Sequence, residues 1–266
     1  MSHTAGIDIG STYTKAAILD EAGELVGSAM RPTGFKLEEA AQEMFDRALE
    51  AAGLPRDRID YVATTGFGRH LVSFRDVQVT DLTAQAWGTR AFFPETRTVL
   101  DVGGQTMKAM RLDADGKVRS FRLNDKCAAG TGAFLEKTAR YLGYRIEEIG
   151  PLVESSKEVV PISGVCAVFA ESEVINHVTQ GAAPGDIMHG AMASLIEKSV
   201  RLMKRVQMEP EFTLVGGIMR FPTMVKVMRE HLSEGVNVPL GELVQLTGAI
   251  GAGVLARRRL EKLQAA

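Results

Sequence analysis

Near its N-terminus the chain reads Ile7-Asp-Ile-Gly-Ser-Thr-Tyr-Thr-Lys-Ala-Ala-Ile-Leu-Asp20, and the pattern returns as Leu100-Asp-Val-Gly-Gly-Gln-Thr-Met-Lys-Ala-Met-Arg-Leu-Asp113. Each copy has an apolar strand that ends in Asp, a glycine turn, and a second strand with Lys at the same offset. A charged turn and a third strand follow each copy, at Leu25–Met30 and Val118–Leu123. The repeat therefore predicts a duplicated α/β protein of two lobes, each opening with a three-stranded antiparallel meander.

Helix and strand patterns follow each copy, which predicts a mixed sheet flanked by helices in both lobes. We place the first lobe at residues 1–95 plus 248–266 and the second at 96–247. No low-complexity linker separates the lobes, so they are expected to share an interface. The predicted strands are Tyr61–Thr64 and Phe212–Val215, and the predicted helices are Leu37–Ala52 with a stop at Gly53, Leu82–Ala91, Gly132–Leu142, Ala170–Gln180, Ile187–Val206, Thr223–Leu232 and Leu246–Leu263.

Composition excludes several classes of partner. The 31 Lys and Arg nearly balance the 33 Asp and Glu, and aromatic residues make up only 6%, so nucleic acid is not an expected partner. No apolar stretch approaches the about 18 residues that a membrane span needs, and the N-terminus leads directly into a strand without a leader sequence. We therefore expect a cytoplasmic protein without membrane association, whose cysteines are thiols or metal ligands and not a disulfide.

The two glycine turns have the chemistry of phosphate-binding loops. Their backbone N–H groups and hydroxyls can donate hydrogen bonds, and glycine lets an anion approach the backbone closely. Asp8 and Asp101 would face one another across an interlobe nucleotide cleft, where carboxylates hold Mg²⁺ through its water shell.

One such turn is ordinary in a hairpin. Two copies, together with a later strand that ends in Gly216-Gly217 where an adenosine could lie against bare backbone, favour ATP binding. The candidate nucleotide-binding residues in these segments are Gly10, Ser11, Thr12, Lys15, Gly103, Gly104, Thr106, Gly216 and Gly217.

Several further candidates have a structural alternative. Gly130-Thr131-Gly132 at a helix start could receive phosphate or ribose, or it is a plain helix-entry turn. Glu136 on the following helix could reach a ribose hydroxyl, or it is an exposed glutamate. Lys15 and Lys108 could contact phosphates or be solvated. Gln105 is the candidate for orienting the attacking water during hydrolysis.

The chain has two cysteines, Cys127 and Cys166, and each precedes a helical pattern. Structural zinc sites and cubane iron-sulfur centres need about four ligands. Two thiolates would therefore need a second polypeptide to complete a site, and a cluster shared across a twofold axis meets that count. The alternative is a pair of buried thiols that behave as small apolar side chains.

The assembled motifs resemble those of the activator ATPases of 2-hydroxyacyl-CoA dehydratases and of the related ATPase subunits of benzoyl-CoA reductase. The similarity runs almost end to end. The cysteine segments are highly specific to this family, whereas the phosphate turns are shared with the wider actin, Hsp70 and sugar-kinase superfamily. The matching segments are Thr64-Thr-Gly-Phe-Gly-Arg69, Asp101-Val-Gly-Gly-Gln105, Asn124-Asp-Lys-Cys-Ala-Ala-Gly-Thr-Gly132 and Cys166-Ala-Val-Phe-Ala-Glu-Ser-Glu-Val-Ile175.

This resemblance implies an actin-like ATPase fold that binds Mg-ATP and a 4Fe-4S cluster ligated by two cysteines from each of two subunits. Cys127 and Cys166 would be the ligands from this chain. The resemblance further implies that ATP hydrolysis drives a low-potential electron into an iron-sulfur partner enzyme, a CoA-thioester reductase or dehydratase. Reduced ferredoxin or flavodoxin is the expected electron donor.

Two positions depart from the pattern of the dehydratase activators. Those proteins commonly carry an Asp directly after the second-turn Gln, where this chain has Thr106. They also carry an Asn four residues past the Gly-Gly pair, where this chain has Phe221. Both departures favour the benzoyl-CoA reductase branch, whose ATPase subunits pair as unlike chains, so the second subunit is either like or unlike this one.

Two other functions compete with this one. An actin-like small-molecule kinase with incidental cysteines would need a general base and an acceptor pocket, and the sequence offers no candidate for either. An assembly ATPase that forms filaments would sediment with ATP and would not change its behaviour when both thiols are removed.

Overall fold

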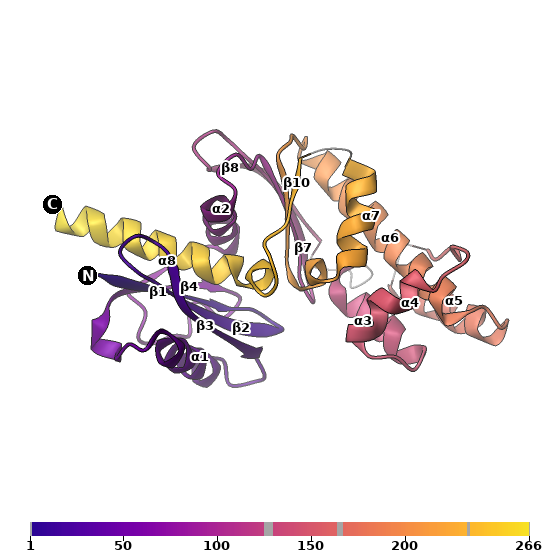
Figure 1. The fold of residues 1–266 in the computed structure, drawn as a ribbon, viewed down its shortest axis with the longest axis horizontal. Helices are drawn as coiled ribbons and strands as arrows, with labels where there is room; N and C mark the ends of the chain where they lie inside the picture. Colours follow the sequence, from indigo (N-terminus) through magenta and orange to yellow (C-terminus); the bar gives the residue numbers. More distant parts are fainter. Residues whose placement is uncertain (1, 125–129, 164–166, 233–234, 266) are drawn as a thin grey trace. The chain divides into compact units, whose positions relative to one another are not determined.

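The computed structural model describes residues 2–124, 130–163, 167–232 and 235–265, and Figure 1 shows its fold. The chain forms two compact units. The first comprises Met1–Thr96, Asp113–Val118 and Gln245–Ala266, and the second comprises Arg97–Leu112 and Arg119–Val244. The lobe limits expected from the sequence stay a prediction.

The first unit contains a five-stranded mixed sheet. Its strands are β1 (His3–Ile9), β2 (Tyr13–Leu19), β3 (Leu25–Pro32), β4 (Ile59–Gly66) and β5 (Val77–Gln78). The strand order is β3-β2-β1-β4-β5, in which β2 is antiparallel to both neighbours and β4 is parallel to both neighbours. The carboxyl end of β1 is thus flanked by the start of β2 and by the end of β4.

Helices cover both faces of this sheet. Ile7 of β1 lies in a core cluster with Phe45 of α1 (Leu37–Ala52). The neighbouring Gly6 faces the other side, since successive strand residues alternate, and a Cβ there would collide with the carbonyl of Ala249 in α8 (Leu243–Gln264). α2 (Asp81–Phe92) lies on that second face too, because Ala84 clusters with alanines of β4 and α8.

The second unit repeats the sheet of the first. Its strands are β6 (Thr98–Val102), β7 (Met107–Leu112), β8 (Val118–Asn124), β9 (Phe212–Val215) and β10 (Val236–Asn237). Their order is β10-β9-β6-β7-β8, with β7 antiparallel and β9 parallel to β6. Read from the opposite edge, this is the order of the first sheet, which confirms the duplication predicted from the sequence.

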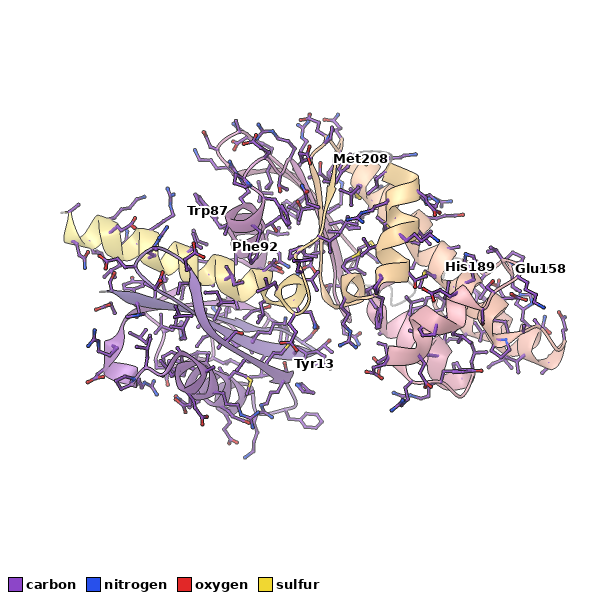
Figure 2. All side chains as sticks on the ribbon, viewed as in Figure 1. Tyr13, Trp87, Phe92, Glu158, His189 and Met208 are labelled. Carbon is purple, nitrogen blue, oxygen red and sulfur yellow. The ribbon has the colours of Figure 1, made fainter. Side chains whose placement is uncertain are left out.

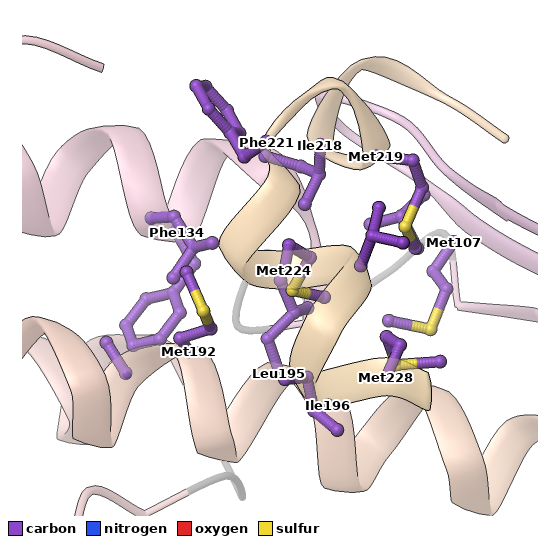
Figure 3. Close-up of a cluster of buried hydrophobic side chains, with 14 of the residues drawn as sticks. Met107, Phe134, Met192, Leu195, Ile196, Ile218, Met219, Phe221, Met224 and Met228 are labelled. Atoms are coloured by element: carbon purple, nitrogen blue, oxygen red, sulfur yellow. The ribbon is translucent and has the colours of Figure 1, made fainter. Parts of the chain in front are cut away.

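The core of the second unit is rich in methionine (Figure 3). Met107 of β7 packs in one cluster with Phe134 of α3 (Gly132–Tyr141) and Met192 of α6 (Pro184–Arg205). Met224 and Met228 add the buried face of α7 (Pro222–Leu232). An unbranched thioether fills irregular gaps between helices, so the abundance of methionine in this chain is explained by packing.

The predicted elements are present, with differences at their ends. α6 begins at Pro184, before the predicted Ile187, because proline is well placed in a first helical turn. α5 (Ala167–Thr179) begins before the predicted Ala170. Short elements with little periodicity were not predicted: α4 (Ile149–Glu154), β5, β10 and the 3-10 turns η1 (Arg56–Arg58), η3 (Ile146–Glu148) and η4 (Gly217–Arg220). Within the described ranges, the helices are too short or too polar to cross a membrane.

Candidate functional site

The first glycine turn joins β1 to β2, and Tyr13 begins β2 beside it (Figure 2). Asp8 pairs with Lys15 in the register of the two strands, and Lys15 Nζ lies 2.9 Å from Asp8 Oδ2. The Gly10 N–H donates to the Tyr13 carbonyl at 3.1 Å, which closes the turn. Thr33, the residue directly after β3, supports the turn, because its hydroxyl donates to the Gly10 carbonyl at 2.8 Å. A charged pair is thereby held at the end of the sheet.

The second glycine turn joins β6 to β7 in the same way. Asp101 pairs with Lys108 in the strand register, with 3.5 Å between Lys108 Nζ and Asp101 Oδ2. The Gly103 N–H donates to the Thr106 carbonyl at 2.8 Å. Lys15 and Lys108 are thus ion-paired with the turn aspartates and partly buried, whereas the sequence left open whether they were solvated.

The two units share a third feature, a glycine with a positive φ beside each turn aspartate. Gly66 ends β4 with a φ of +87°, and Gly216 follows β9 with a φ of +96°. A Cβ at Gly66 would collide with Asp8 Oδ1, and one at Gly216 would lie 2.7 Å from Asp101 Oδ1. Each aspartate therefore lies against the backbone of a glycine. That glycine is at the end of the strand that runs parallel to the aspartate's own strand. From the sequence, Gly216 was a predicted site residue and Gly66 was not, although Gly66 ends β4 and Gly216 directly follows β9.

The turn residues differ in exposure. Ser11 and Gln105, at the tips of the two turns, are exposed. Their neighbours Thr12, Gly104 and Thr106 are half-buried. Hydroxyl, amide and backbone donors are therefore accessible at both turns, as phosphate binding requires. Gly217 begins η4, directly after the positive-φ residue Gly216.

The segment before α3 is attached to the second turn. The N–H groups of Gly132 and Ala133 donate to the carbonyls of Gly103 and Gly104, both at 2.9 Å. These two helix N-terminal donors are therefore already used within the protein. Thr131 is the N-cap of α3 and is fully buried. The helix start is thus hydrogen-bonded to the turn, and the binding of phosphate or ribose by Gly130-Thr131-Gly132 stays a prediction.

Glu136 and Lys137 of α3 each make an ion pair. Glu136 is exposed and lies 3.5 Å from Arg140 on the same helix. Lys137 reaches α5, where its Nζ lies 2.6 Å from Glu171 Oε1. The hydrogen bond to Glu171 raises the pKa of Lys137. Lys137 and Glu171 thus join α3 to α5, the two helices that follow the cysteines in sequence.

Cys127 and Cys166 lie outside the described residues. Among the residues that the structure describes, no three His, Cys, Asp or Glu side chains converge in a way that could hold a metal ion. Mg²⁺ commonly uses one or two protein carboxylates and completes its shell with water and phosphate oxygens. The partly buried carboxylates of Asp8 and Asp101 fit that donor set.

Comparison with known proteins decides the family. The model of the BadF/BadG/BcrA/BcrD ATPase family matches residues 5–256. The chain belongs to this family. The predictions of family, of ATPase class and of an actin-like α/β fold with two mixed sheets are thereby confirmed.

Two relatives are similar to this chain over nearly their whole length. The chain is 37% identical to the 2-hydroxyisocaproyl-CoA dehydratase activator of Clostridioides difficile, over 96% of this chain and 94% of the relative. It is 35% identical to a subunit of benzoyl-CoA reductase from Thauera aromatica, over 99% and 96%. The solved structure of the Clostridium difficile activator with bound ADPNP superposes with a TM-score of 0.91 at 36% identity, covering 99% of this chain and 97% of that one.

Proposed function

We propose that the protein is an ATP-hydrolysing iron-sulfur electron-transfer protein that drives a low-potential electron into a CoA-thioester reductase or dehydratase. The observation that carries the proposal is the near full-length match to an activator of a CoA-thioester dehydratase and to a subunit of benzoyl-CoA reductase. The two matching glycine turns, each with a partly buried aspartate and lysine, supply the phosphate chemistry that such a function needs.

In this proposal the two turns bind the phosphates of Mg-ATP. The backbone N–H groups and hydroxyls of the turns donate to phosphate oxygens, and Lys15 and Lys108 add positive charge beside them. Asp8 and Asp101 orient the water shell of Mg²⁺. Gly216 and Gly217 are the proposed backbone contacts of the nucleoside.

Cys127 and Cys166 are the proposed ligands of a 4Fe-4S cluster that is completed by a second ATPase subunit. When bound, the cluster would supply a one-electron carrier. α3 and α5 begin shortly after these cysteines, and their N-terminal dipole ends would favour an anionic group. The Lys137–Glu171 ion pair holds the two helices together.

The branch of the family is assigned from two positions. Identities of 37% and 35% do not separate the dehydratase activator from the reductase component. Thr106 and Phe221 favour the reductase branch. Phe221 is 8% exposed and packs in the core of the second unit, where an Asn would need a polar partner. The electron donor would be a reduced ferredoxin or flavodoxin.

The test is anaerobic purification followed by iron and sulfide analysis, a visible spectrum and an ATPase assay. We expect iron and sulfide in the amounts of one 4Fe-4S cluster per pair of subunits. Cys127→Ser and Cys166→Ser should each abolish the cluster while ATP binding persists. Retention of a full cluster by either variant would contradict the shared site, and acceptor-dependent phosphoryl transfer by protein without iron would identify the kinase alternative.

A further inference from the structure

A groove lies in the second unit, between α7 and the segment 238–241 that leads from β10 toward α8. Its volume is about 580 Å³. Sites for small molecules commonly have volumes of about 300–1,000 Å³. None of the residues that line the groove was predicted from the sequence as a site residue. Its size alone therefore makes it a candidate for a ligand that the phosphate turns do not account for.

The inner wall of the groove belongs to the core of the second unit. Met219 of η4 and Val225 of α7 line the groove and are nearly buried in that core, where Figure 3 labels Met219. Val238 lines the opposite wall and packs against the same core. The apolar walls are therefore fixed by core packing, as in a site that is formed before its ligand binds.

The apolar wall continues outward to solvent. Pro239 and Leu240 line the groove beyond Val238, and Leu240 is 83% exposed. A single exposed leucine is common on protein surfaces. Here the leucine extends a wall that begins in the core, so one apolar group lying along this wall would be removed from water over its whole length.

Two cations without partners lie on the helical side of the groove. Lys226 and Arg229 of α7 are exposed, and their side chains have no ion-pair or hydrogen-bond partner among the residues that the structure describes. Arg220 also lines the groove but is paired with Glu147 at 3.6 Å. Residues three apart on a helix have Cβ atoms about 5–6 Å apart, so Lys226 and Arg229 can contact one phosphate or two linked phosphates.

These walls call for a ligand with an anionic head and an apolar arm. Inorganic phosphate has the head without the arm. ATP also lacks an apolar arm, and its proposed site is at the glycine turns. A CoA thioester has both parts, because its nucleotide end carries phosphates and its pantetheine arm ends in an acyl group. Arginine and lysine are the side chains that bind phosphates in proteins.

We propose that this groove binds a CoA thioester, with Lys226 and Arg229 on its phosphates and Leu240 against its pantetheine and acyl arm. The inference rests on the proposed function, in which the partner enzyme acts on a CoA thioester. It gives the ATPase its own site for that class of molecule, formed by residues other than those proposed to hold Mg-ATP. Binding makes and breaks no covalent bond.

The test is isothermal titration calorimetry of the full chain with benzoyl-CoA as the probe. The protein is purified anaerobically and saturated with ADP, so that the nucleotide site is occupied. We expect benzoyl-CoA to bind more tightly than CoA, which lacks the acyl group, and CoA to bind more tightly than 3′-dephospho-CoA. Inorganic phosphate at the same concentration should not compete. Affinity should fall as salt rises, because exposed charges are screened.

The double variant Lys226→Gln with Arg229→Gln should lower the affinity for benzoyl-CoA at least about tenfold, because charge-assisted hydrogen bonds to phosphate are lost. Leu240→Ser should weaken benzoyl-CoA more than CoA. The three side chains are exposed, so all variants should keep the wild-type unfolding midpoint and wild-type ATP hydrolysis in the absence of CoA compounds.

Arg201→Gln with Lys204→Gln is the matched control. These two cations have the same spacing on α6, are also exposed, and do not line the groove. This double variant should bind benzoyl-CoA as the wild type does. The inference is overturned by an equal loss of affinity in the control, by binding that occurs only without ADP, or by no binding at millimolar benzoyl-CoA. Failure of the proposed function would appear separately, as protein without iron or without ATP hydrolysis.

Discussion

The N–H of Gly132 donates a 2.9 Å hydrogen bond to the carbonyl of Gly103, which joins the start of α3 to the second phosphate turn. Ala133 repeats this contact with Gly104. A displacement of the turn must therefore move the helix start or break two hydrogen bonds. Cys127 precedes this helix in the sequence, so nucleotide state and cluster environment are expected to be linked. The free energy of this linkage cannot exceed the difference in nucleotide-binding free energy between two positions of the turn and the helix start.

The first prediction tests this linkage. ATP should change the rate at which a chelator removes cluster iron, relative to ADP, and Thr131→Val should reduce that difference more than it lowers iron content. Thr131 is fully buried and directly precedes the two N–H groups that bond to the turn, so a change in its side chain should disturb that connection. The measurement is anaerobic chelation with ATP, with ADP and without nucleotide.

Thr138→Val is the control for that experiment. Thr138 is also buried on α3, but its hydroxyl donates to the Phe134 carbonyl of the same helix at 2.9 Å. This variant should leave the ATP-to-ADP difference unchanged. Identical chelation rates in all nucleotide states of the wild type would mean that ATP does not act through the cluster.

The second prediction concerns the repeated aspartates. Asp8→Asn and Asp101→Asn should each lower ATP hydrolysis at least about tenfold, or ~1.4 kcal/mol of transition-state stabilisation, because each removes a carboxylate proposed to hold the Mg²⁺ water shell. Iron content should stay at the wild-type value. The measurement is phosphate release at saturating and limiting Mg²⁺.

The repeat itself supplies the control pair for these variants. Asp20 and Asp113 end the two copies, and each accepts a 2.9 Å hydrogen bond in an exposed turn, from the N–H of Glu24 and of Lys117. Asp20→Asn and Asp113→Asn should keep normal hydrolysis. Equal losses in the control variants and in Asp8→Asn would show that the effect is not specific to the phosphate turns.

The sequence predicted the parts of the fold that repeat. In both copies Asp and Lys are seven residues apart, on opposite sides of a glycine turn. Two antiparallel strands joined by such a turn pair residues at equal distances from it, so the repeated spacing was sufficient to predict the repeated hairpin. Gly66 was not predicted as a site residue, since it acts through a distant neighbour. Gly66 matters because the Asp8 carboxylate lies against it. Such contacts depend on packing between elements, which has no local sequence signal.

The third prediction uses the two positive-φ glycines that lie against the aspartates. Gly66→Ala and Gly216→Ala should strongly reduce ATP hydrolysis, because an added Cβ would displace the carboxylates of Asp8 and Asp101. An alanine at a positive φ is also strained, which lowers stability by about 1–3 kcal/mol. Both effects can be measured by an ATPase assay together with denaturant unfolding.

Gly53→Ala is the control that separates the effect of backbone strain from the effect of displacing an aspartate carboxylate. Gly53 has a φ of +66° at the end of α1, but nothing lies within 4 Å of an added Cβ. This variant should lose stability through backbone strain alone and keep hydrolysis. Normal hydrolysis in Gly66→Ala would show that the position of Asp8 is not critical.

The last prediction concerns the segment that leads toward Cys166, at the corner where Figure 2 labels Glu158 and His189. Asp186 Oδ1 accepts hydrogen bonds from the N–H groups of Glu158 and Lys157 at 3.1 and 2.8 Å. These bonds lower the pKa of Asp186, with smaller contributions from the Ser156 hydroxyl and the nearby His189. The side chain thereby attaches residues 156–158 to the first turn of α6.

The sign of the pH effect follows from that lowered pKa. A carboxyl whose pKa is lower in the folded state contributes stability above its unfolded value of about 3.9, and that stability is lost as pH falls through the folded value. Wild-type protein should therefore lose more stability between pH 7 and pH 3 than Asp186→Asn, which should already be less stable at pH 7. Urea midpoints across this range measure both effects, and parallel curves for the two proteins would contradict the assignment. Because residues 156–158 precede Cys166, we also expect Asp186→Asn to speed chelation of cluster iron at neutral pH.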